Sequence, residues 1–342
     1  MSITDTSAAQ STRRGFLGAL ASLPLAAGGV LGPARTMAQD RYPSRTIKLI
    51  VPFAPGSSTD IAARSWGEVI GRQLGGASVI VDNRAGAGGN IGATAVARST
   101  PDGYTLLYST ATTWAIAPLI YQDLAYQPTR DFLPVAVTTT VPTLLVVGGD
   151  SDIRSFQDLA ARVKAAPDRH SYGSNGVGAN SHITCKLIAN RLGVPNLLHV
   201  PFKQGSQGVM AEVAAGRLTF AVDPWSVVGP LVRAGRLRAL AATGSKRLSV
   251  APEIPTLSEM LHEELDTTTW SGLWAPAGTP ADTVSRLHEA IAAGRKNVVL
   301  ARQFEEQGTP LMPDMSLQQV NTFMKQEVDR WRVMVKEAQI TV

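Results

Sequence analysis

Apolar and polar positions along the chain follow two alternating patterns: short apolar runs, and longer stretches with an apolar residue every three or four positions. The run Ile-Lys-Leu-Ile-Val at 47–51 is rich in β-branched residues and is followed by two prolines, which is typical of a buried strand that ends abruptly. From Ala62 to Leu74, apolar residues then recur every four positions, which predicts a helix beginning near Thr59. We therefore expect a strand, a loop and a helix in this segment.

The same alternation continues to the end of the chain and predicts an α/β protein. Further strands are predicted at 79–81, 104–108, 133–138, 143–147, 171–173, 197–200, 218–222, 237–242 and 270–274. Helices are predicted at 91–98, 114–120, 156–166, 182–192, 207–215, 280–297 and 317–338. Ser155 and Asp158 indicate a capping box at the start of the third of these helices.

The loop before the first helix carries the residue types of an anion site. Gly56 lets the backbone turn, and residues 57–60, Ser-Ser-Thr-Asp, can all cap a helix. The helix then points unpaired N–H groups and the positive end of its dipole into a crevice, where a carboxylate or phosphate can bind. An ordinary capped helix that binds nothing is the alternative.

Residues 174–181, Ser-Asn-Gly-Val-Gly-Ala-Asn-Ser, repeat this arrangement in the second half of the chain. Two such loops facing one another would hold one anion from both sides. We expect Ser109 to face the same crevice, and Asp223 to lie where another strand ends on it. Trp225 either forms the floor of the crevice or packs in the core.

The first 38 residues differ from the rest and resemble a twin-arginine export signal. Arg13 and Arg14 precede an apolar region at 16–31, and Thr-Met-Ala at 36–38 offers small residues before a cut. A membrane anchor is the weaker alternative because a proline and glycines interrupt the apolar region, which is shorter than the roughly 20 residues that a span needs. The mature chain is expected to begin at Gln39 in the periplasm, which argues against dependence on intracellular ATP or reduced nicotinamide.

Charge and cysteine content further limit the classes of function that fit the sequence. Without the first 38 residues the chain has 29 basic and 26 acidic residues, a net charge of +3. The basic residues are scattered and not interleaved with aromatics, so we expect no nucleic-acid partner. Cys185 is the only cysteine, which rules out an internal disulfide, and the sequence has no Cys/His cluster that would indicate a zinc site. About 300 mature residues with 44% hydrophobic content suffice for two cores.

Two functional hypotheses, nucleotide binding and hydrolysis, are not supported by the spacing of their motif residues. The glycine-rich loop at 86–92 follows a strand, but Ile91 stands where a dinucleotide fingerprint needs glycine, so we reject nucleotide binding and expect these glycines to let the next helix pack closely. Ser174 with His182 suggests a hydrolase, but a nucleophile elbow needs glycine where Tyr172 stands. We expect no cofactor, no metal and no catalytic residue.

Several motifs, in order along the mature chain, resemble those of the Bug-type substrate-binding proteins of tripartite tricarboxylate transporters. They are Tyr42-Pro43, residues 51–56, Thr59-Asp60, 82–92, 102–104, 173–176, Ser181-His182 and 235–240. The resemblance implies a two-domain periplasmic binding fold of type II (Venus flytrap), each domain a mixed sheet flanked by helices. We expect domain 1 at 39–140 plus 265–342 and domain 2 at 141–264.

The resemblance also implies a monomeric binding protein that captures a small carboxylate and delivers it to the membrane components of such a transporter. The expected ligand-binding residues are Phe53, Pro55, Gly56, Ser57, Ser58, Thr59, Asp60, Ser109, Ser174, Asn175, Gly176, Gly178, Ser181, Phe202 and Asp223. The family loop at 202–208 is altered here, and Thr219 and Pro224-Trp225 depart from the pattern. A ligand sensor for a signalling receptor and an exported hydrolase remain as alternatives.

Overall fold

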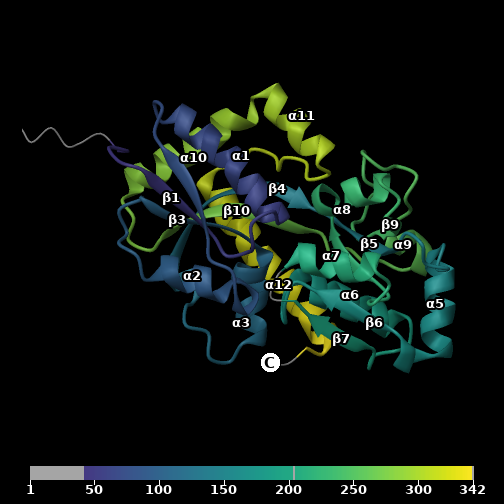
Figure 1. Ribbon diagram of the computed structural model, residues 1–342. Helices are drawn as coiled ribbons and strands as arrows, with labels where there is room; N and C mark the ends of the chain where they lie inside the picture. The colour runs from purple at the N-terminus through teal and green to yellow at the C-terminus, as the bar shows by residue number, and fades with distance from the viewer. Residues whose placement is uncertain (1–41, 203–204, 341–342) are drawn as a thin grey trace, which may run out of the picture. The chain divides into compact units, whose positions relative to one another are not determined.

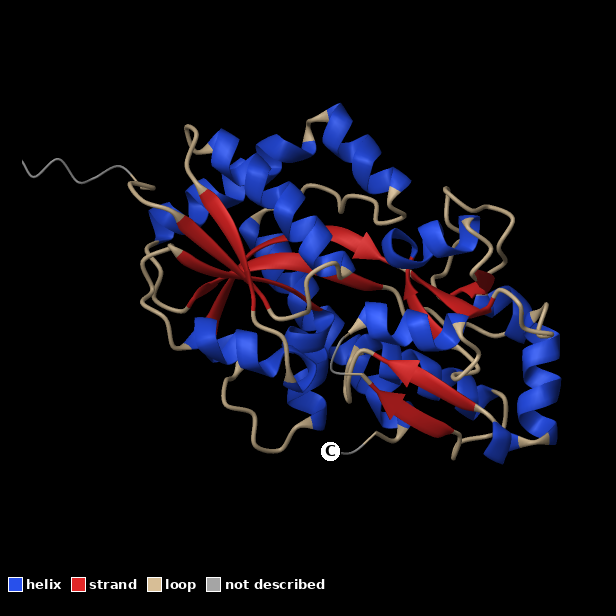
Figure 2. Ribbon diagram, in the orientation of Figure 1, coloured by secondary structure: helices blue, strands red, loops and turns tan. Residues whose placement is uncertain are grey.

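The computed structural model describes residues 42–202 and 205–340, whose strands form three sheets (Figures 1 and 2). The first sheet has the order β2-β1-β3-β10-β4, with bounds Val79–Asn83, Ile47–Val51, Thr105–Thr110, Thr269–Pro276 and Phe132–Val141. The second has the order β8-β5-β9, with bounds Ala221–Pro224, Thr143–Gly148 and Leu237–Ala242. The third pairs β6, Ser171–Ser174, with β7, Leu198–Pro201.

Helices connect these strands. They are α1 Ser58–Gln73, α2 Asn90–Ala97, α3 Ala117–Ile120, α4 Pro128–Asp131, α5 Phe156–Ala165, α6 Asn180–Arg191, α7 Ser206–Ala214, α8 Trp225–Arg233, α9 Leu257–Leu261, α10 Ala281–Arg295, α11 Val298–Glu306 and α12 Leu317–Ala338. Shorter turns lie at η1 Ala87–Gly89, η2 Thr112–Ile116 and η3 Pro167–Arg169. We call the five-stranded sheet and its helices the first lobe, and the other two sheets and their helices the second lobe.

The five-stranded sheet is buried on both faces. β1 runs parallel to β2 and β3, whereas β10 runs antiparallel to β3 and β4. Leu49 and Val51 pack with residues of α1 and α10 on one face, while Ile50 points into a second cluster on the other. Because β1 and β3 are parallel, the loops that follow them meet at the same edge of the sheet.

The second lobe is built around β5, which pairs antiparallel with both β8 and β9. Leu144 and Val146 face one apolar cluster, and Leu145 and Val147 face the cluster that contains residues of α6. β6 and β7 run parallel, and a bridge between Tyr172 and Phe220 joins them to the region before β8. The loop after β6 therefore opens toward the end of β8.

The chain passes between the lobes twice, and the two crossings lie side by side. Pro142 separates β4 from β5, and a longer segment leads from β9 to β10. The hydroxyls of Thr143 and Thr243 lie 2.7 Å apart, and Thr269 pairs with Val141. The expected crossings near Val141 and Leu265 thus fall together, while the domain boundaries themselves remain a prediction because residues 41–342 form one compact unit.

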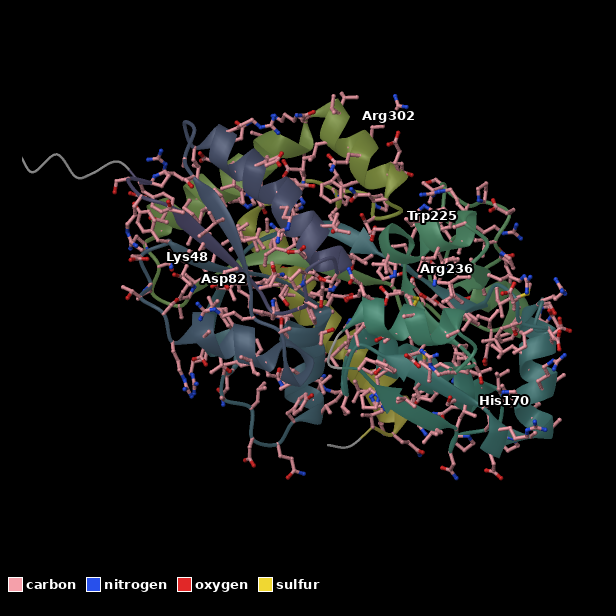
Figure 3. The ribbon with its side chains drawn as sticks, viewed as in Figure 1. Lys48, Asp82, His170, Trp225, Arg236 and Arg302 are labelled. Atoms are coloured by element: carbon pink, nitrogen blue, oxygen red, sulfur yellow. The ribbon has the colours of Figure 1, made fainter. Side chains whose placement is uncertain are left out.

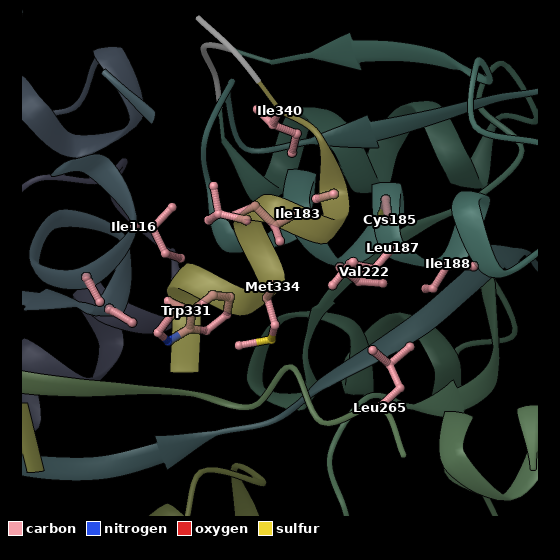
Figure 4. Close-up of a cluster of buried hydrophobic side chains, with 14 of the residues drawn as sticks. Ile116, Ile183, Cys185, Leu187, Ile188, Val222, Leu265, Trp331, Met334 and Ile340 are labelled. Atoms are coloured by element: carbon pink, nitrogen blue, oxygen red, sulfur yellow. The ribbon is translucent and has the colours of Figure 1, made fainter. Parts of the chain in front are cut away.

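Helix α12 packs against both lobes. It contacts η2 and β4 in the first lobe and α6 in the second. Trp331 and Met334 belong to one buried cluster with Ile116 of the first lobe and Ile183 of the second (Figure 4). The helical period over 317–338 predicts an apolar stripe at Val320, Met324, Trp331 and Val335, and these residues are buried in the core that both lobes share.

Most predicted elements are present, with local differences. The helix expected at 114–120 is divided into η2 and α3, where Pro118 lacks the N–H that an unbroken helix would need. The strand expected at 218–222 starts later, at Ala221, because the turn that ends α7 extends to Leu218 through a hydrogen bond to Glu212. The expected export signal at 1–38 and the start at Gln39 lie outside the described residues. Within the described ranges, none of the helices combines the length and the apolar character that crossing a membrane requires.

Candidate anion-binding site

A cavity of about 320 Å³ lies between the two lobes. Nine of the expected ligand-binding residues line it: Phe53, Ser57, Ser58, Thr59, Asn175, Gly176, Ser181, Phe202 and Asp223. The first four come from the loop after β1 and the start of α1, and the others from the loop after β6, the start of α6 and the ends of β7 and β8. The structure therefore brings the two predicted loops to one space.

Six expected residues do not line the cavity: Pro55, Gly56, Asp60, Ser109, Ser174 and Gly178. Ser109 is fully buried on β3 and accepts a hydrogen bond from Thr113, whereas its neighbour Thr110 lines the cavity. Successive side chains of a strand point to opposite faces, so only one of the two can face the ligand space. Of the others, Gly56, Asp60, Ser174 and Gly178 make hydrogen bonds that support the two loops.

Asp60 fixes the first loop. Its carboxylate accepts hydrogen bonds from the Gly56 amide at 3.0 Å, from Arg64 at 2.9 and 3.1 Å, and from the Asn83 side chain at 2.9 Å. Burial acts to raise the pKa of Asp60, but the bonds from Arg64, Gly56 and Asn83 outweigh it and hold this pKa below its usual value. Asn83 also donates to the carbonyl of Phe53. The loop is thereby tied to α1 and to the end of β2.

Ser174 and two histidines support the second loop. The Ser174 hydroxyl lies 2.7 Å from His199 Nε2 and accepts a hydrogen bond from the Gly176 amide. His182 stacks on His199 with ring centroids 3.8 Å apart, and its Nδ1 accepts from the Gly178 amide at 3.2 Å. Burial lowers the pKa of His182 to about 3 and that of His199 to about 4, so both rings are neutral near pH 7. The two histidines therefore support the loop without adding a positive charge to it.

The amides of the three glycines expected to bind the ligand are not open donors. The amides of Gly56, Gly176 and Gly178 are already bonded to Asp60, Ser174 and His182. Several other amides on the cavity wall have no acceptor among the described residues: Ser58, Thr59, Ala87, Gly88, Val177, Asn180, Ser181 and Ser206. The glycines shape the two loops, and their neighbours supply the open N–H groups.

Four longer helices begin at the cavity, and their amino ends give it a positive field. Residues at the starts of α1, α6, α7 and α8 line it. Within the described ranges, neither lysine, arginine nor histidine contributes to its wall. Basic side chains labelled in Figure 3, such as Arg302 on α11 and His170 before β6, lie outside the cavity wall. Helix dipoles and open amides together favour a bound anion.

Asp223 is the acidic residue of the cavity wall and is 1% exposed. Its carboxylate accepts hydrogen bonds from the Ser206 hydroxyl at 3.0 Å and from the Asn175 side chain at 3.2 Å. Burial raises the pKa of Asp223 to about 7, against the opposing effect of these two bonds. Asp223 can therefore be protonated or ionised near neutral pH, depending on what binds beside it.

The glycine-rich loop at 85–89 was not expected in the site but lines the cavity, together with Tyr121. Its backbone turns through positive φ at Gly86, Gly88 and Gly89, and the Gly88 amide is one of the open donors. Gly92 does serve the expected close packing, because a Cβ there would lie 2.8 Å from Pro52. Its position after β2 could have indicated that it lies in the site, because β2 runs parallel to β1 and the carboxyl ends of parallel strands lie at the same edge of a sheet.

Trp225, labelled in Figure 3 at the start of α8, packs in the core of the second lobe and does not line the cavity. A Cβ on Gly308 would lie 2.7 Å from the Cβ of Trp225, so the chain after α11 covers it. In the part of the chain that the structure describes, no group of three or more histidine, cysteine, aspartate or glutamate residues could hold a metal ion.

Comparisons with known proteins agree with this geometry. The model of the tripartite tricarboxylate transporter family receptor (TctC) matches residues 62–340. Protein BugT of Bordetella pertussis is 33% identical over 310 residues, which cover 90% of this chain and 93% of BugT. Among solved structures, Rhodopseudomonas palustris Rpa4515 with adipate has a TM-score of 0.83 and 32% identity, covering 88% of this chain and 99% of that one. MatC from the same organism, with bound malate, has a TM-score of 0.80 and 29% identity, covering 86% and 100%.

Proposed function

This chain belongs to the tripartite tricarboxylate transporter receptor family, with the fold of periplasmic binding proteins, and we propose that it captures a small carboxylate between its two lobes. Both the family and the fold class predicted from the sequence are confirmed. The observation that carries the proposal is the cavity wall: open backbone amides at the starts of long helices, with no basic side chain from the described residues. In the proposed role, the protein works in the periplasm as a monomer and delivers its ligand to the membrane components of a transporter.

A carboxylate suits this wall better than a neutral ligand. Each open N–H can donate to a carboxylate oxygen, and such charge-assisted bonds are roughly twice as strong as neutral ones. A ligand bonded to Thr59 on one side and Val177 on the other touches both lobes, so it favours their closed arrangement. Adipate and malate, the acids held by two structural relatives, are of the size that a cavity of about 320 Å³ accepts.

An exported hydrolase is the less supported alternative. Ser174 and His199 form a serine–histidine contact of 2.7 Å, which is the geometry of an activated nucleophile. However, the Ser174 side chain is fully buried, does not line the cavity and also bonds to the carbonyl of Gly176. We therefore assign this pair to loop support. A sensor that presents its closed form to a receptor would use the same site, and a pull-down of membrane partners would distinguish it from a transport component.

A thermal-shift screen tests the proposal. We expect at least one acid from a panel of aliphatic and aromatic mono-, di- and tricarboxylates to stabilise the protein, by about 2.7 kcal/mol at 100 times its dissociation constant. The amides of the same acids serve as the control, since they keep the size and lose the charge. Stabilisation by the amides and by none of the acids would contradict an anion site.

Carboxylate affinity is expected to rise as the pH falls from 8 to 6. Burial raises the pKa of Asp223 to about 7, and a bound carboxylate beside it would raise this pKa further, because two like charges in one cavity repel. Binding then takes up a proton, and the dissociation constant at pH 6 should be about 5- to 10-fold lower than at pH 8. Isothermal titration calorimetry in two buffers of different ionisation enthalpy measures both effects.

The matched variant for this prediction is Asp223→Asn, which keeps the shape and an acceptor for Ser206 but cannot ionise. Its affinity should be nearly independent of pH over this range. If wild-type affinity instead rises with pH, Asp223 accepts a hydrogen bond from the ligand in its ionised form, and the preferred acid carries an amine or hydroxyl at its distal end.

A further inference from the structure

The peptide that joins Val177 to Gly178 is held at both of its polar atoms. The Tyr121 hydroxyl donates to the Val177 carbonyl at 2.9 Å, and the Gly178 amide donates to His182 Nδ1 at 3.2 Å. Tyr121 follows α3 in the first lobe, whereas Val177, Gly178 and His182 all belong to the second. One of the two bonds therefore crosses the cavity and the other does not.

The surroundings of Tyr121 are shaped to fit its ring. A Cβ at Gly88 would lie 3.1 Å from both the Tyr121 hydroxyl and the Val177 carbonyl oxygen. A Cβ at Gly178 would lie 3.3 Å from the Tyr121 ring. Glycine at these two positions, one in each lobe, leaves the space in which the cross-cavity bond forms.

The bond from Gly178 to His182 lies wholly within the second lobe. His182 is 7% exposed and stacks on His199, which contacts Ser174 at the start of the same loop. Because His182 Nδ1 accepts from Gly178, the proton of the neutral ring is on Nε2, and the Gly178 amide is not free to donate into the cavity. The Val177 amide, on the preceding peptide, is the open donor on the cavity wall.

We propose that Tyr121 is a positioning residue that couples closure of the lobes to the final geometry of the second anion-binding loop. Only when the lobes are closed does its hydroxyl reach Val177 and complete the clamp on the Val177–Gly178 peptide. The clamp fixes the adjoining Val177 amide toward the ligand. The inference rests on the proposed function, since it needs a carboxylate that bridges the lobes.

Stopped-flow fluorescence of the six tryptophans, with adipate and malate as probes, tests this role in Tyr121→Phe. The bond exists only in the closed form, so its loss should accelerate release and leave entry unchanged. The loss of one neutral hydrogen bond predicts a koff about 3- to 10-fold higher, with kon within about 2-fold of wild type. The melting temperature of the ligand-free variant should stay near that of wild type.

Tyr42→Phe is the matched control. It removes a tyrosine hydroxyl that donates to the carbonyl of Gly103 at 2.8 Å within the first lobe, away from the cavity. We expect it to leave koff unchanged. Gly88→Ala gives a second disturbance of the same clamp, since its methyl would meet both partners of the cross-cavity bond, and it should also raise koff.

The outcomes separate this inference from the proposed function. If the wild-type protein binds adipate or malate and both Tyr121→Phe and Gly88→Ala release it at the wild-type rate, Tyr121 does not position the loop. If Tyr121→Phe slows kon and leaves koff unchanged, the residue guides entry and the clamp is wrong. If the wild type binds neither these two acids nor any other in the panel, the proposed function fails and this inference fails with it.

Discussion

Replacing Gly56 or Gly176 by valine is expected to weaken carboxylate binding by at least about 100-fold, which corresponds to roughly 2.7 kcal/mol. Gly56 has φ +77° and Gly176 has φ +125°, values that a β-branched residue adopts only at considerable cost. A Cβ on Gly56 would also lie 2.5 Å from Nε2 of Gln207 in the second lobe, so this flexible side chain would have to move. Calorimetric titration of each variant with the best acid of the panel measures the loss.

Gly75→Val is the matched control for backbone strain. Gly75 has the same φ of +77° as Gly56 but lies just after α1, where an added Cβ meets nothing within 4 Å. The variant should be less stable than wild type and should keep its affinity. Arg84→Gln should also bind normally, because this arginine is half-exposed and pairs with Asp82. If Arg84→Gln loses binding while the Gly56→Val and Gly176→Val proteins bind normally, the anion does not bind at the two loops.

These glycines also show what the sequence could and could not predict. The pattern of strand, Gly/Ser loop and helix start gave both loops, because helix capping and turn formation depend on short-range chemistry. Which amides stay open depends on how side chains four residues further along, in the first turn of the following helix, are oriented, and the residue pattern does not specify that orientation. Asp60 occupies the Gly56 amide through a helix turn, and His182 occupies the Gly178 amide through its ring. Most of the expected residues therefore lie in the two loops that border the cavity, but several of them support its wall without lining it.

Residues contributed by other segments were harder to predict. Tyr121 lies 56 positions before Val177, and no local pattern marks it as a cavity residue. Loop 85–89 was interpreted only as a packing element, because its glycines do not match a nucleotide motif. Both assignments needed the order of strands in the sheet, which an isolated sequence does not supply.

The sequence also does not show which elements an amphipathic helix packs against. The stripe of Val320, Met324 and Trp331 correctly predicted one buried face on α12, since the 3.6-residue period reports burial. It did not indicate that the carboxyl-terminal half of the helix packs on the second lobe, where Asn190 donates to the Glu337 carbonyl and Arg191 pairs with the Glu337 side chain. Any motion of the lobes must therefore be compatible with a shared helix (Figure 4).

Glu327→Ala is expected to lower the free energy of unfolding by about 3–5 kcal/mol, the range for breaking a buried, hydrogen-bonded ion pair. Glu327 is 7% exposed and accepts hydrogen bonds from the indoles of Trp270 at 2.6 Å and Trp331 at 3.1 Å. It also pairs with Arg330, which donates to the Asp266 carbonyl in the segment that returns to the first lobe. Removing the carboxylate leaves two indole N–H groups without an acceptor, and Arg330 loses its counter-charge while it keeps its bonds to the carbonyls of Asp266 and Thr268. Urea denaturation followed by circular dichroism measures the change.

Two variants distinguish this network from a general effect of losing a glutamate. Glu306→Ala removes one partner of an exposed pair with Arg302 on α11 and should cost less than about 0.5 kcal/mol. Glu327→Gln keeps an oxygen that can accept from one indole but cannot pair with Arg330, so its cost should lie between those of the two alanine variants. A Glu327→Ala protein as stable as the Glu306→Ala protein would mean that water replaces the carboxylate, and that α12 is held to the returning segment by its apolar stripe alone.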